Sequence, residues 1–237
     1  MNEVDWEGAV NARRVAGRLY RMGRSEWLTE RGWRQAYAEG IRTVVDLRNP
    51  GERSRRPTDP DVGPEALAGI TVLNCPTEDQ AHAGFMAAVA SADTPYPNHP
   101  RYYPANLEHF PDLVAGVFSA LARARGSVVV HCSAGRDRTG LIVSLALALA
   151  GKRELVATQD DAGARGINEW HRISPVKHPY ERHLAPGELD KVLVGRQESL
   201  AAFVDAVDVE EFLLRHGLTD AEIGAVRALL GADASAS

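Results

Sequence analysis

The stretch from Ser127 to Gly151 constrains the fold more than any other part of the chain, because a strand, a tight loop and an apolar helix follow one another directly in it. Its first part, SVVVHC, is rich in β-branched residues and typical of a buried strand. Its last part, DRTGLIVSLALALAG, is apolar nearly all round, which predicts a central buried helix. Units of this kind belong to parallel sheets that carry helices on their faces.

Other segments predict the same architecture. Residues 17–23 indicate a short strand or hairpin arm, and the β-branched runs at 41–49 and 69–76 indicate two further strands. Thr29 suits the N-cap of an intervening helix that Gly40 would end. We therefore expect an α/β fold with a central, mostly parallel sheet flanked by helices.

The connecting segments are less regular. Residues 77–105 are rich in proline and predict a surface excursion that could close over a site as a lid. Residues 107–126 place apolar side chains at helical spacing and predict one helix. Residues 152–195 are polar, so we predict there only a short helix near Leu155, and we expect the two aspartates at 160–161 to be solvated.

The C-terminal part, residues 196–231, predicts two or three amphipathic helices. Thr219 and Glu222 stand at the start of the last one in the pattern of a capping box. We expect residues 1–231 to form a single domain that includes this helical part, and the tail at 232–237 to be disordered.

Composition excludes several classes of protein. The chain carries 27 Lys and Arg against 32 Asp and Glu, a net charge of −5, which argues against a nucleic-acid partner. Two cysteines, Cys75 and Cys132, cannot form a disulfide framework. The first residues have no apolar signal core, and the apolar run at 140–151 is too short to span a bilayer. We expect a cytoplasmic protein without integral membrane association; signal-free export and the oligomeric state stay open.

The loop HCSAGRDRTG between the predicted strand and helix has the features of an anion-binding site. Such a loop directs several backbone N–H groups into one concavity, and the N-terminus of the following helix adds partial positive charge. Gly135 permits tight curvature, and Ser133 and Ala134 are too small to obstruct a bound group. Arg138 can hold two oxygens of a phosphate with its planar guanidinium.

Cys132 stands at the mouth of this loop, where the helix N-terminus and a nearby arginine favour the thiolate. A thiolate that faces a phosphate-shaped pocket is suited to in-line attack on a phosphomonoester, which gives a phosphocysteine that water hydrolyses. Arg138 and the loop amides would stabilise the charge on the transferring group. Thr139 would stabilise the leaving thiolate, and His131 would anchor the loop by an internal hydrogen bond. The alternative is an inert buried cysteine followed by a surface turn.

The same residues resemble the phosphate-binding loop of the protein tyrosine phosphatase superfamily, in which a cysteine, five residues, an arginine and a serine or threonine follow one another. The matching positions are His131, Cys132, Gly135, Arg138, Thr139 and Gly140. The loop is also similar to the HCxAGKDRTG loop of a bacterial subgroup active on tyrosine phosphates and phosphoinositides, the triple-specificity phosphatases. The segments NARRVAGRLYRMGR, TVVDLRNPGER and GLTDAEIGAVRALL resemble further elements of that subgroup.

The resemblance implies a tyrosine-phosphatase-like fold and a phosphatase for which we expect no cofactor and no metal. The implied substrate is a phosphorylated protein carrying phosphotyrosine, with phosphoserine, phosphothreonine and phosphoinositide as further candidates, and the product is inorganic phosphate. The implied phosphate-binding residues are Ser133, Ala134, Gly135, Arg136, Asp137, Arg138 and Thr139. Arg136 replaces the lysine of the lipid-active members, which keeps the charge but changes its geometry.

Phosphate ester cleavage benefits from a carboxylic acid that protonates the leaving oxygen. The sequence has no Trp-Pro-Asp tripeptide, from which many tyrosine phosphatases supply this acid. Asp137 matches an aspartate of the resembling subgroup, and we predict it as the acid; a carboxylate that only stabilises the helix N-terminus is the alternative. Asp79 and Asp46 are the other candidate acids, although we expect Asp46 and Arg48 to brace the site.

Further alternatives stay open. A phosphate-recognition module without turnover, or a sulfur-transferring or arsenate-reducing enzyme, would use a similar loop, although a reactive thiolate together with Thr139 favours the phosphatase. Cys75 could pair with Cys132 if their strands are neighbours, and an unpaired buried thiol is the simpler alternative. Residues 165–183 carry arginines and histidines, which are compatible with a solvated polar loop, a basic rim for an acidic substrate or, less well supported, a metal site.

Overall fold

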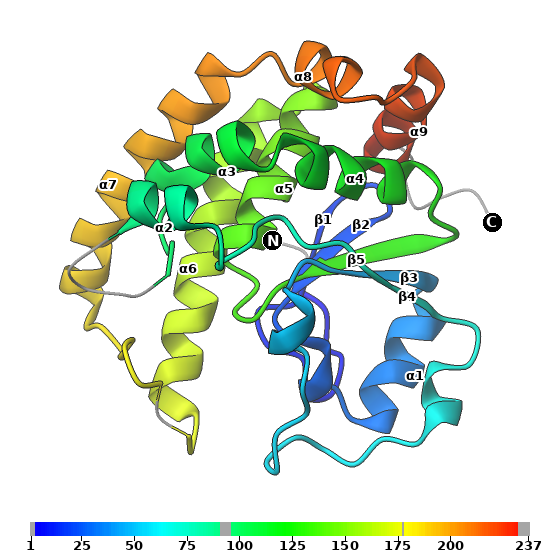
Figure 1. The fold of residues 1–237 in the computed structure, drawn as a ribbon. Coiled ribbons are helices and arrows are strands. Elements are labelled where there is room, and N and C mark those ends of the chain that lie inside the picture. Colours follow the sequence, from blue (N-terminus) through cyan, green and yellow to red (C-terminus); the bar gives the residue numbers. More distant parts are fainter. Residues whose placement is uncertain (1–2, 91–95, 177, 232–237) are drawn as a thin grey trace.

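The computed structural model describes residues 3–90, 96–176 and 178–231, which form one mixed sheet with helices on both of its faces (Figure 1). The strands are β1 (Arg13–Ala16), β2 (Leu19–Met22), β3 (Ile41–Asp46), β4 (Thr71–Asn74) and β5 (Ser127–His131). They stand in the order β1-β2-β5-β3-β4; β1 and β2 are antiparallel, and all other neighbours are parallel. The predicted α/β fold with a mostly parallel central sheet is confirmed.

The α-helices of the described residues are α1 (Glu30–Ala38), α2 (Ala83–Val89), α3 (Tyr103–His109), α4 (Pro111–Ala122), α5 (Asp137–Leu149), α6 (Val156–Ile173), α7 (Pro186–Ala206), α8 (Val209–Arg215) and α9 (Asp220–Gly231). The short 3-10 helices are η1 (Ser25–Trp27), η2 (Pro50–Glu52), η3 (Pro64–Leu67), η4 (Pro100–Tyr102) and η5 (Arg153–Leu155). Helix α1 covers one face of the sheet, and α4, α5 and α9 lie on the other (Figure 1).

The alternation of side chains along the strands divides the core in two. Val44 and Val129 pack with Trp33 of α1 in the smaller cluster, while Val45 and Val130 belong to the larger cluster on the other face. Helix α5 is buried along most of its length, as its uniformly apolar sequence predicts. Its N-terminus therefore lies at the carboxyl edge of the sheet, directly after β5.

Two predicted helix caps are confirmed. The Thr29 hydroxyl accepts a hydrogen bond from the Gly32 N–H at 3.1 Å and begins α1, and Gly40, with a φ of 88°, follows its end. At the start of α9, the Glu222 N–H donates to the Thr219 hydroxyl at 3.3 Å, and the Thr219 N–H donates to the Glu222 carboxylate at 3.0 Å. These reciprocal bonds satisfy N–H groups that a helix N-terminus leaves unpaired.

The predicted helix over residues 107–126 is two helices, α3 and α4. Phe110 separates them, with φ −134° and ψ 45°, outside the helical region. Pro111 begins α4, and a proline disfavours the helical conformation of the residue before it. Leu113 is exposed, and the buried side chains of α4 are Val114, Ala115, Val117, Phe118 and Leu121.

Residues 152–195 differ most from expectation, because they form the 18-residue helix α6 and the start of α7 instead of a short helix near Leu155. The buried face of α6 includes Asp160 and Gly163 and so lacks a continuous apolar stripe. The expectation that Asp160 is solvated is wrong: it is 2% exposed, and its carboxylate accepts a hydrogen bond from Arg196 at 2.8 Å. Ion pairing and close packing take the place of the apolar contacts by which a helix is recognised.

The C-terminal helices α7, α8 and α9 follow the predicted order, although α7 begins at Pro186, before residue 196. Helix α9 packs against α4 and against the hairpin of β1 and β2, where the Arg18 N–H donates to the Leu229 carbonyl at 2.8 Å. Residues 91–95 of the proline-rich excursion and the expected tail at 232–237 lie outside the described residues. Among the described helices, none has the length and apolar character needed to cross a membrane.

Candidate active site

The buried thiol of Cys132 lies at the end of strand β5, where a tight loop begins. Cys132 follows His131, the last residue of β5, and is 3% exposed, and α5 begins at Asp137. Gly135 has a φ of 67° and lies so close to β2 that a Cβ atom there would be 2.2 Å from the Met22 carbonyl oxygen. The positive φ and the close approach both require glycine, so Gly135 accounts for the tight curvature of the loop.

Arg138 lies in the first turn of α5 and forms a two-point ion pair with Glu52 of η2, at 2.6 and 2.7 Å. The carboxylate of buried Glu78 is 3.9 Å from Arg138 Nε. Burial opposes the charge of Arg138, but the hydrogen bonds to Glu52 and the charge of Glu78 hold the pKa of the guanidinium above its ordinary value. Burial also opposes ionisation of Glu52, yet hydrogen bonding and charge from Arg138 outweigh it and lower the pKa of this carboxyl.

His131 links the loop to an ion pair at the end of β3. Its Nδ1 lies 3.1 Å from the Cys132 carbonyl oxygen and 3.9 Å from Asp46. Asp46 accepts hydrogen bonds from Arg48 at 2.8 and 2.9 Å, and Arg48 also donates to Glu26 at 2.7 Å. The Asp46–Arg48 pair therefore approaches the loop through His131, and neither residue is among the described residues that line the pocket.

We expect the free energy of unfolding to decrease as the pH falls below about 6.5, because burial lowers the pKa of His131 below its ordinary value. Below that pH the histidine is protonated in the unfolded chain but stays neutral in the folded one. The free energy of unfolding then falls by up to about 1.4 kcal/mol per pH unit for each such proton. Burial also lowers the pKa of His178, and it lowers the pKa of His99 to about 4. The carboxyls of Asp46 and Glu52, whose pKa values are also lowered, add to the loss below about pH 4.5.

Urea unfolding between pH 4 and 8 measures this decrease. A His131→Gln variant should give a shallower decrease between pH 6.5 and 5, because one of the protons taken up on unfolding is removed. An equal slope in both proteins would contradict the assignment of a neutral, buried His131.

The carboxyl group of Asp137 is held by two arginines. Arg136 Nε donates to Asp137 Oδ2 at 2.8 Å, and both Nη atoms of Arg196 lie 3.2 Å from Oδ1. Arg196 comes from α7, is 3% exposed and also binds Asp160 of α6. The Tyr103 hydroxyl donates to the Asp137 carbonyl at 3.0 Å. Asp137 is thus the point where α3, α6 and α7 are connected to the loop.

Arg136 is engaged with the segment that follows α6. Its two Nη atoms donate to Glu181 at 3.0 and 2.8 Å. Glu181 also accepts from the Tyr96 hydroxyl at 3.1 Å, and His171 Nε2 lies 3.3 Å from it. Burial opposes the charge of Glu181, but Arg136 and His171 lower the pKa of its carboxyl far below the usual range. The guanidinium of Arg136 is therefore bound on all three of its nitrogens, with Asp137 on Nε.

The remaining predicted residues take the following positions. The Thr139 hydroxyl is fully buried and has no hydrogen-bond partner in the described part of the chain. Asp79 is exposed, accepts a hydrogen bond from the Ala81 N–H at 2.8 Å and is not among the described residues that line the pocket. Cys75 and Cys132 are both free, and β3 lies between their strands, so the condition for their pairing is not met.

A pocket of about 750 Å³ opens above Cys132 and the loop. Trp27 and Trp170 stand on its wall with their ring centroids 4.9 Å apart. Its lining from the loop is Cys132, Ser133, Ala134, Arg136, Asp137 and Arg138. Its other lining includes Glu52, Arg56, Glu78, Tyr96, Pro97, Ile167, His171, Val176, His178 and Glu181. A thiol, an arginine and an aspartate therefore face one aromatic-walled cavity.

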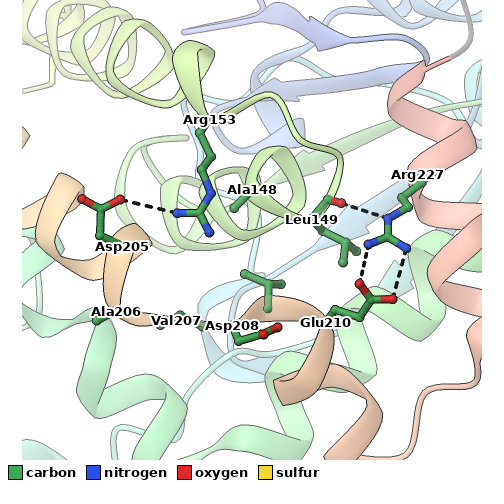
Figure 2. A pocket seen from close by; sticks show the side chains of 10 residues that line it. Ala148, Leu149, Arg153, Asp205, Ala206, Val207, Asp208, Glu210 and Arg227 are labelled. Atoms are coloured by element: carbon green, nitrogen blue, oxygen red, sulfur yellow. Dashed lines mark hydrogen bonds and ion pairs between the residues drawn. The ribbon is translucent and has the colours of Figure 1, made fainter.

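A second hollow, of about 450 Å³, lies at the opposite end of α5 (Figure 2). Arg227 donates there to the Leu149 carbonyl at 3.0 Å and to Glu210, and Arg153 is paired with Asp205 at 3.5 Å. These arginines already have partners, and neither of the two cysteines lines this hollow. The candidate chemistry therefore lies at the N-terminal end of α5.

Residues 165–173 belong to α6 and do not form the polar loop considered from the sequence, whereas the described residues 174–176 and 178–183 lie outside helices and strands. Arg165 pairs with Asp161 at 2.9 Å and Arg172 pairs with Glu169, so these two cations face acidic neighbours on the helix surface. Within the described ranges, no three His, Cys, Asp or Glu side chains gather in a way that could hold a metal ion.

The sequence did not predict several residues of the site, among them three ion-pair partners of the loop, Glu52, Arg196 and Glu181. Glu52 stands in the segment TVVDLRNPGER, which carries a resemblance but predicted no role for it. Arg196 lies on a helix far along the chain, and Glu181 lies in a segment without a pattern. Each acts through an ion pair with a loop residue, and a pair of this kind leaves no local periodicity in the sequence.

Comparison with known proteins adds the following. The model of the tyrosine phosphatase family matches residues 6–232 of this chain. A Cupriavidus necator protein described as a candidate tyrosine-protein phosphatase is 27% identical over 211 residues, which are 84% of this chain and 70% of that protein. The crystal structure of P. aeruginosa TpbA aligns with 90% of this chain and 99% of its own, at 15% identity and a TM-score of 0.37. The family match includes the loop and every residue described above as contacting it.

Proposed function

Because the chain belongs to the tyrosine phosphatase family and is therefore a phosphatase, we propose that it hydrolyses phosphotyrosine monoesters through a phosphocysteine on Cys132. In the first step the Cys132 sulfur forms a bond to phosphorus while the bond to the leaving oxygen breaks and that oxygen takes a proton. In the second step water attacks phosphorus, the thiolate leaves and inorganic phosphate is released. The observation that carries the proposal is that Cys132 and Arg138 line one pocket at the N-terminus of α5.

Arg138 would hold the transferring phosphoryl group while Glu52 keeps it in place. A guanidinium has five N–H groups, and Glu52 takes one from each of the two Nη atoms. The N–H groups that Glu52 leaves unused can donate to phosphoryl oxygens. Thr139, whose buried hydroxyl has no partner in the described residues, would donate to the sulfur as the phosphocysteine is cleaved.

The pocket supports an aryl phosphate as substrate. Trp27, Trp170 and Tyr96 give it aromatic walls, which suit the ring of phosphotyrosine better than the short side chain of phosphoserine. Arg136, which stands where lipid-active relatives have lysine, already donates to Glu181 and Asp137. It therefore offers less to the additional phosphates of a phosphoinositide. We propose that the reaction takes place in the cytoplasm, where thiols such as those of Cys75 and Cys132 are kept reduced.

Asp137 is the proposed proton donor. It lines the pocket beside the nucleophile, and its carboxyl oxygens are directed by Arg136 and Arg196. To donate a proton, Asp137 must exchange one of these arginine bonds for the leaving oxygen of the substrate. Its contribution should therefore depend on how much the leaving group needs a proton.

We expect Asp137→Asn to lower kcat/KM for a phosphotyrosine peptide by roughly 10²- to 10⁴-fold. The loss with p-nitrophenyl phosphate should be much smaller, because nitrophenolate leaves without protonation. Steady-state kinetics of both substrates measure the difference, with Asp161→Asn on the surface of α6 as a control that leaves both values unchanged. Equal losses on the two substrates, or an unchanged pH profile, would remove Asp137 as the acid.

The same assay tests the function itself. The intact protein should hydrolyse phosphotyrosine peptides faster than phosphoserine peptides or phosphoinositides in vesicles. If it hydrolyses none of these substrates, the proposed hydrolysis of phosphotyrosine is wrong. A preference for phosphoinositides would instead show that Arg136 is available to additional phosphates despite its ion pairs with Glu181 and Asp137.

A further inference from the structure

We infer that Arg21 and Asn11, from the N-terminal hairpin region, are positioning residues of this reaction: they hold carbonyl oxygens of the loop on its outer side, so that the loop N–H groups face the phosphoryl group. Neither residue lines the pocket among its described residues, so neither would touch the substrate. The inference rests on the proposed function, because a positioned anion site matters only if the loop binds phosphate.

The contacts of these two residues concentrate on consecutive carbonyls. Arg21 Nη2 donates to the Gly135 carbonyl at 2.8 Å and lies 3.3 Å from the Arg136 carbonyl. Asn11 Nδ2 donates to the Ala134 carbonyl at 3.0 Å and lies 3.4 Å from that of Gly135. A guanidinium and an amide thus bind three neighbouring carbonyls of the loop, and the Asn11 amide also donates to the Gly163 carbonyl of α6 at 3.0 Å.

The other two carbonyls of the loop are also bound. The Arg24 N–H donates to the Ser133 carbonyl at 2.9 Å, and His131 Nδ1 is 3.1 Å from that of Cys132. Five consecutive carbonyls, from 132 to 136, therefore have donors. In a planar trans peptide the N–H points opposite to the C=O. Holding these carbonyls outward consequently turns the following N–H groups inward, which is the arrangement that binds a phosphate.

Burial gives this contact its strength. Arg21 is 1% exposed, and all of its hydrogen bonds in the described part of the chain go to backbone carbonyls, including that of Gln159 at 3.1 Å. Arg13, 2% exposed, donates to the side chains of Asn11 at 2.7 Å and Gln159 at 3.0 Å and so fixes the orientation of the asparagine. A hydrogen bond from a buried cation is stronger than one at the surface, since water does not compete for it.

Helix α6 leaves room for these side chains by means of two glycines. A Cβ atom at Gly163 would lie 3.0 Å from Arg13 and 3.1 Å from Arg21, and one at Gly166 would lie 2.4 Å from the Asn11 side chain. A side chain at either position would therefore displace these donors from their present places. The glycines that weaken α6 as a helix therefore have a packing role.

Asn11 also suits its own backbone. Its φ is 60°, the one positive φ outside glycine among the described residues. Asparagine tolerates this conformation better than other residues with a side chain. Glycine tolerates it equally, so Asn11→Gly removes the amide donor without straining the chain.

The experiment measures the affinity of the full chain for tungstate, a phosphate-like oxyanion, by calorimetry, together with kcat and KM for p-nitrophenyl phosphate. Arg21→Met should weaken tungstate binding by about 10- to 100-fold, the effect of losing a buried hydrogen bond from a charged group. Arg21→Lys should recover only part of this, because one ammonium cannot span the carbonyls that the guanidinium fork spans. Asn11→Gly should weaken binding about 3- to 10-fold. In each variant kcat should fall along with the affinity.

Leu213→Ala is the control for stability, because Leu213 is fully buried on α8 at the other end of α5. It should lower the melting temperature and leave tungstate binding unchanged. Tungstate affinity within twofold of the intact protein in Arg21→Met and Asn11→Gly, or full affinity in Arg21→Lys, would overturn the inference. If Arg21→Met does not fold, Asn11→Gly decides alone. An intact protein that binds no tungstate would instead contradict the proposed function.

Discussion

Replacing Cys132 by serine is expected to lower kcat/KM for p-nitrophenyl phosphate by roughly 10⁴- to 10⁶-fold, to a level near the background. Thiolate sulfur is a strong nucleophile, whereas a serine hydroxyl needs a general base to become one. The neighbouring His131 cannot serve as that base, since its Nδ1 faces the Cys132 carbonyl and its Nε2 is buried. The variant therefore keeps the cavity and loses the reaction.

Binding separates this loss from a loss of structure. Serine is close to cysteine in size, and Cys132 is almost fully buried, so the loop should keep its shape and its affinity for tungstate. Steady-state kinetics and calorimetry on the same preparation measure both properties. Activity within tenfold of the intact protein would show that another group attacks phosphorus and that the assignment of the nucleophile is wrong.

Arg138→Lys is expected to lower kcat by roughly 10³-fold or more, in the range found when an arginine that contacts a transferring phosphoryl group is removed. Arg138 donates to Glu52 through two nitrogens and has further N–H groups for the phosphoryl oxygens. A lysine ammonium cannot bind Glu52 and the phosphoryl group in this way, because all of its N–H groups are on a single nitrogen. The carboxylate of Glu52 would then stand unpaired beside an incoming dianion and repel it.

A double variant tests whether unpaired Glu52 repels the phosphate. Glu52→Gln keeps a hydrogen-bond acceptor for Arg138 but removes the negative charge, so Glu52→Gln combined with Arg138→Lys should bind tungstate more tightly than Arg138→Lys alone. Arg165→Lys, on the exposed surface of α6, is the matched control and should leave kcat unchanged. An Arg138→Lys variant with kcat within tenfold of the intact protein would contradict the role given to the guanidinium.

The parts of the fold that could be predicted are those in which burial is apolar. Strands β3 and β5 and helix α5 bury aliphatic side chains, and this burial is visible as β-branched runs and as an unbroken apolar helix. Helix α6 could not be predicted, because Asp160 and Gly163 lie on its buried face where an apolar pattern would require aliphatic residues. What stabilises that face is its partner, Arg196, which is distant in the sequence.

The same distinction applies to the site. The residues from Cys132 to Thr139 are contiguous, so a phosphate-binding loop with a cysteine nucleophile could be predicted from their types and spacing. The groups that orient them, such as Glu52 and Arg196, come from other elements. Asp137 illustrates the limit: its place in the loop followed from the sequence, whereas the two arginines that hold its carboxyl group depend on how α7 packs.

The contact between α9 and the N-terminal hairpin affects the order in which parts of the chain can fold during synthesis. The turn after β1 is closed by the last helix, where the Arg18 N–H donates to Leu229 and Gly17 lies against the Leu229 and Leu230 backbone. A ribosome releases the hairpin before α9. The hairpin that carries Arg21 therefore stays without this partner until α9 has emerged, so the support of the loop is completed only after about 200 further residues have been added.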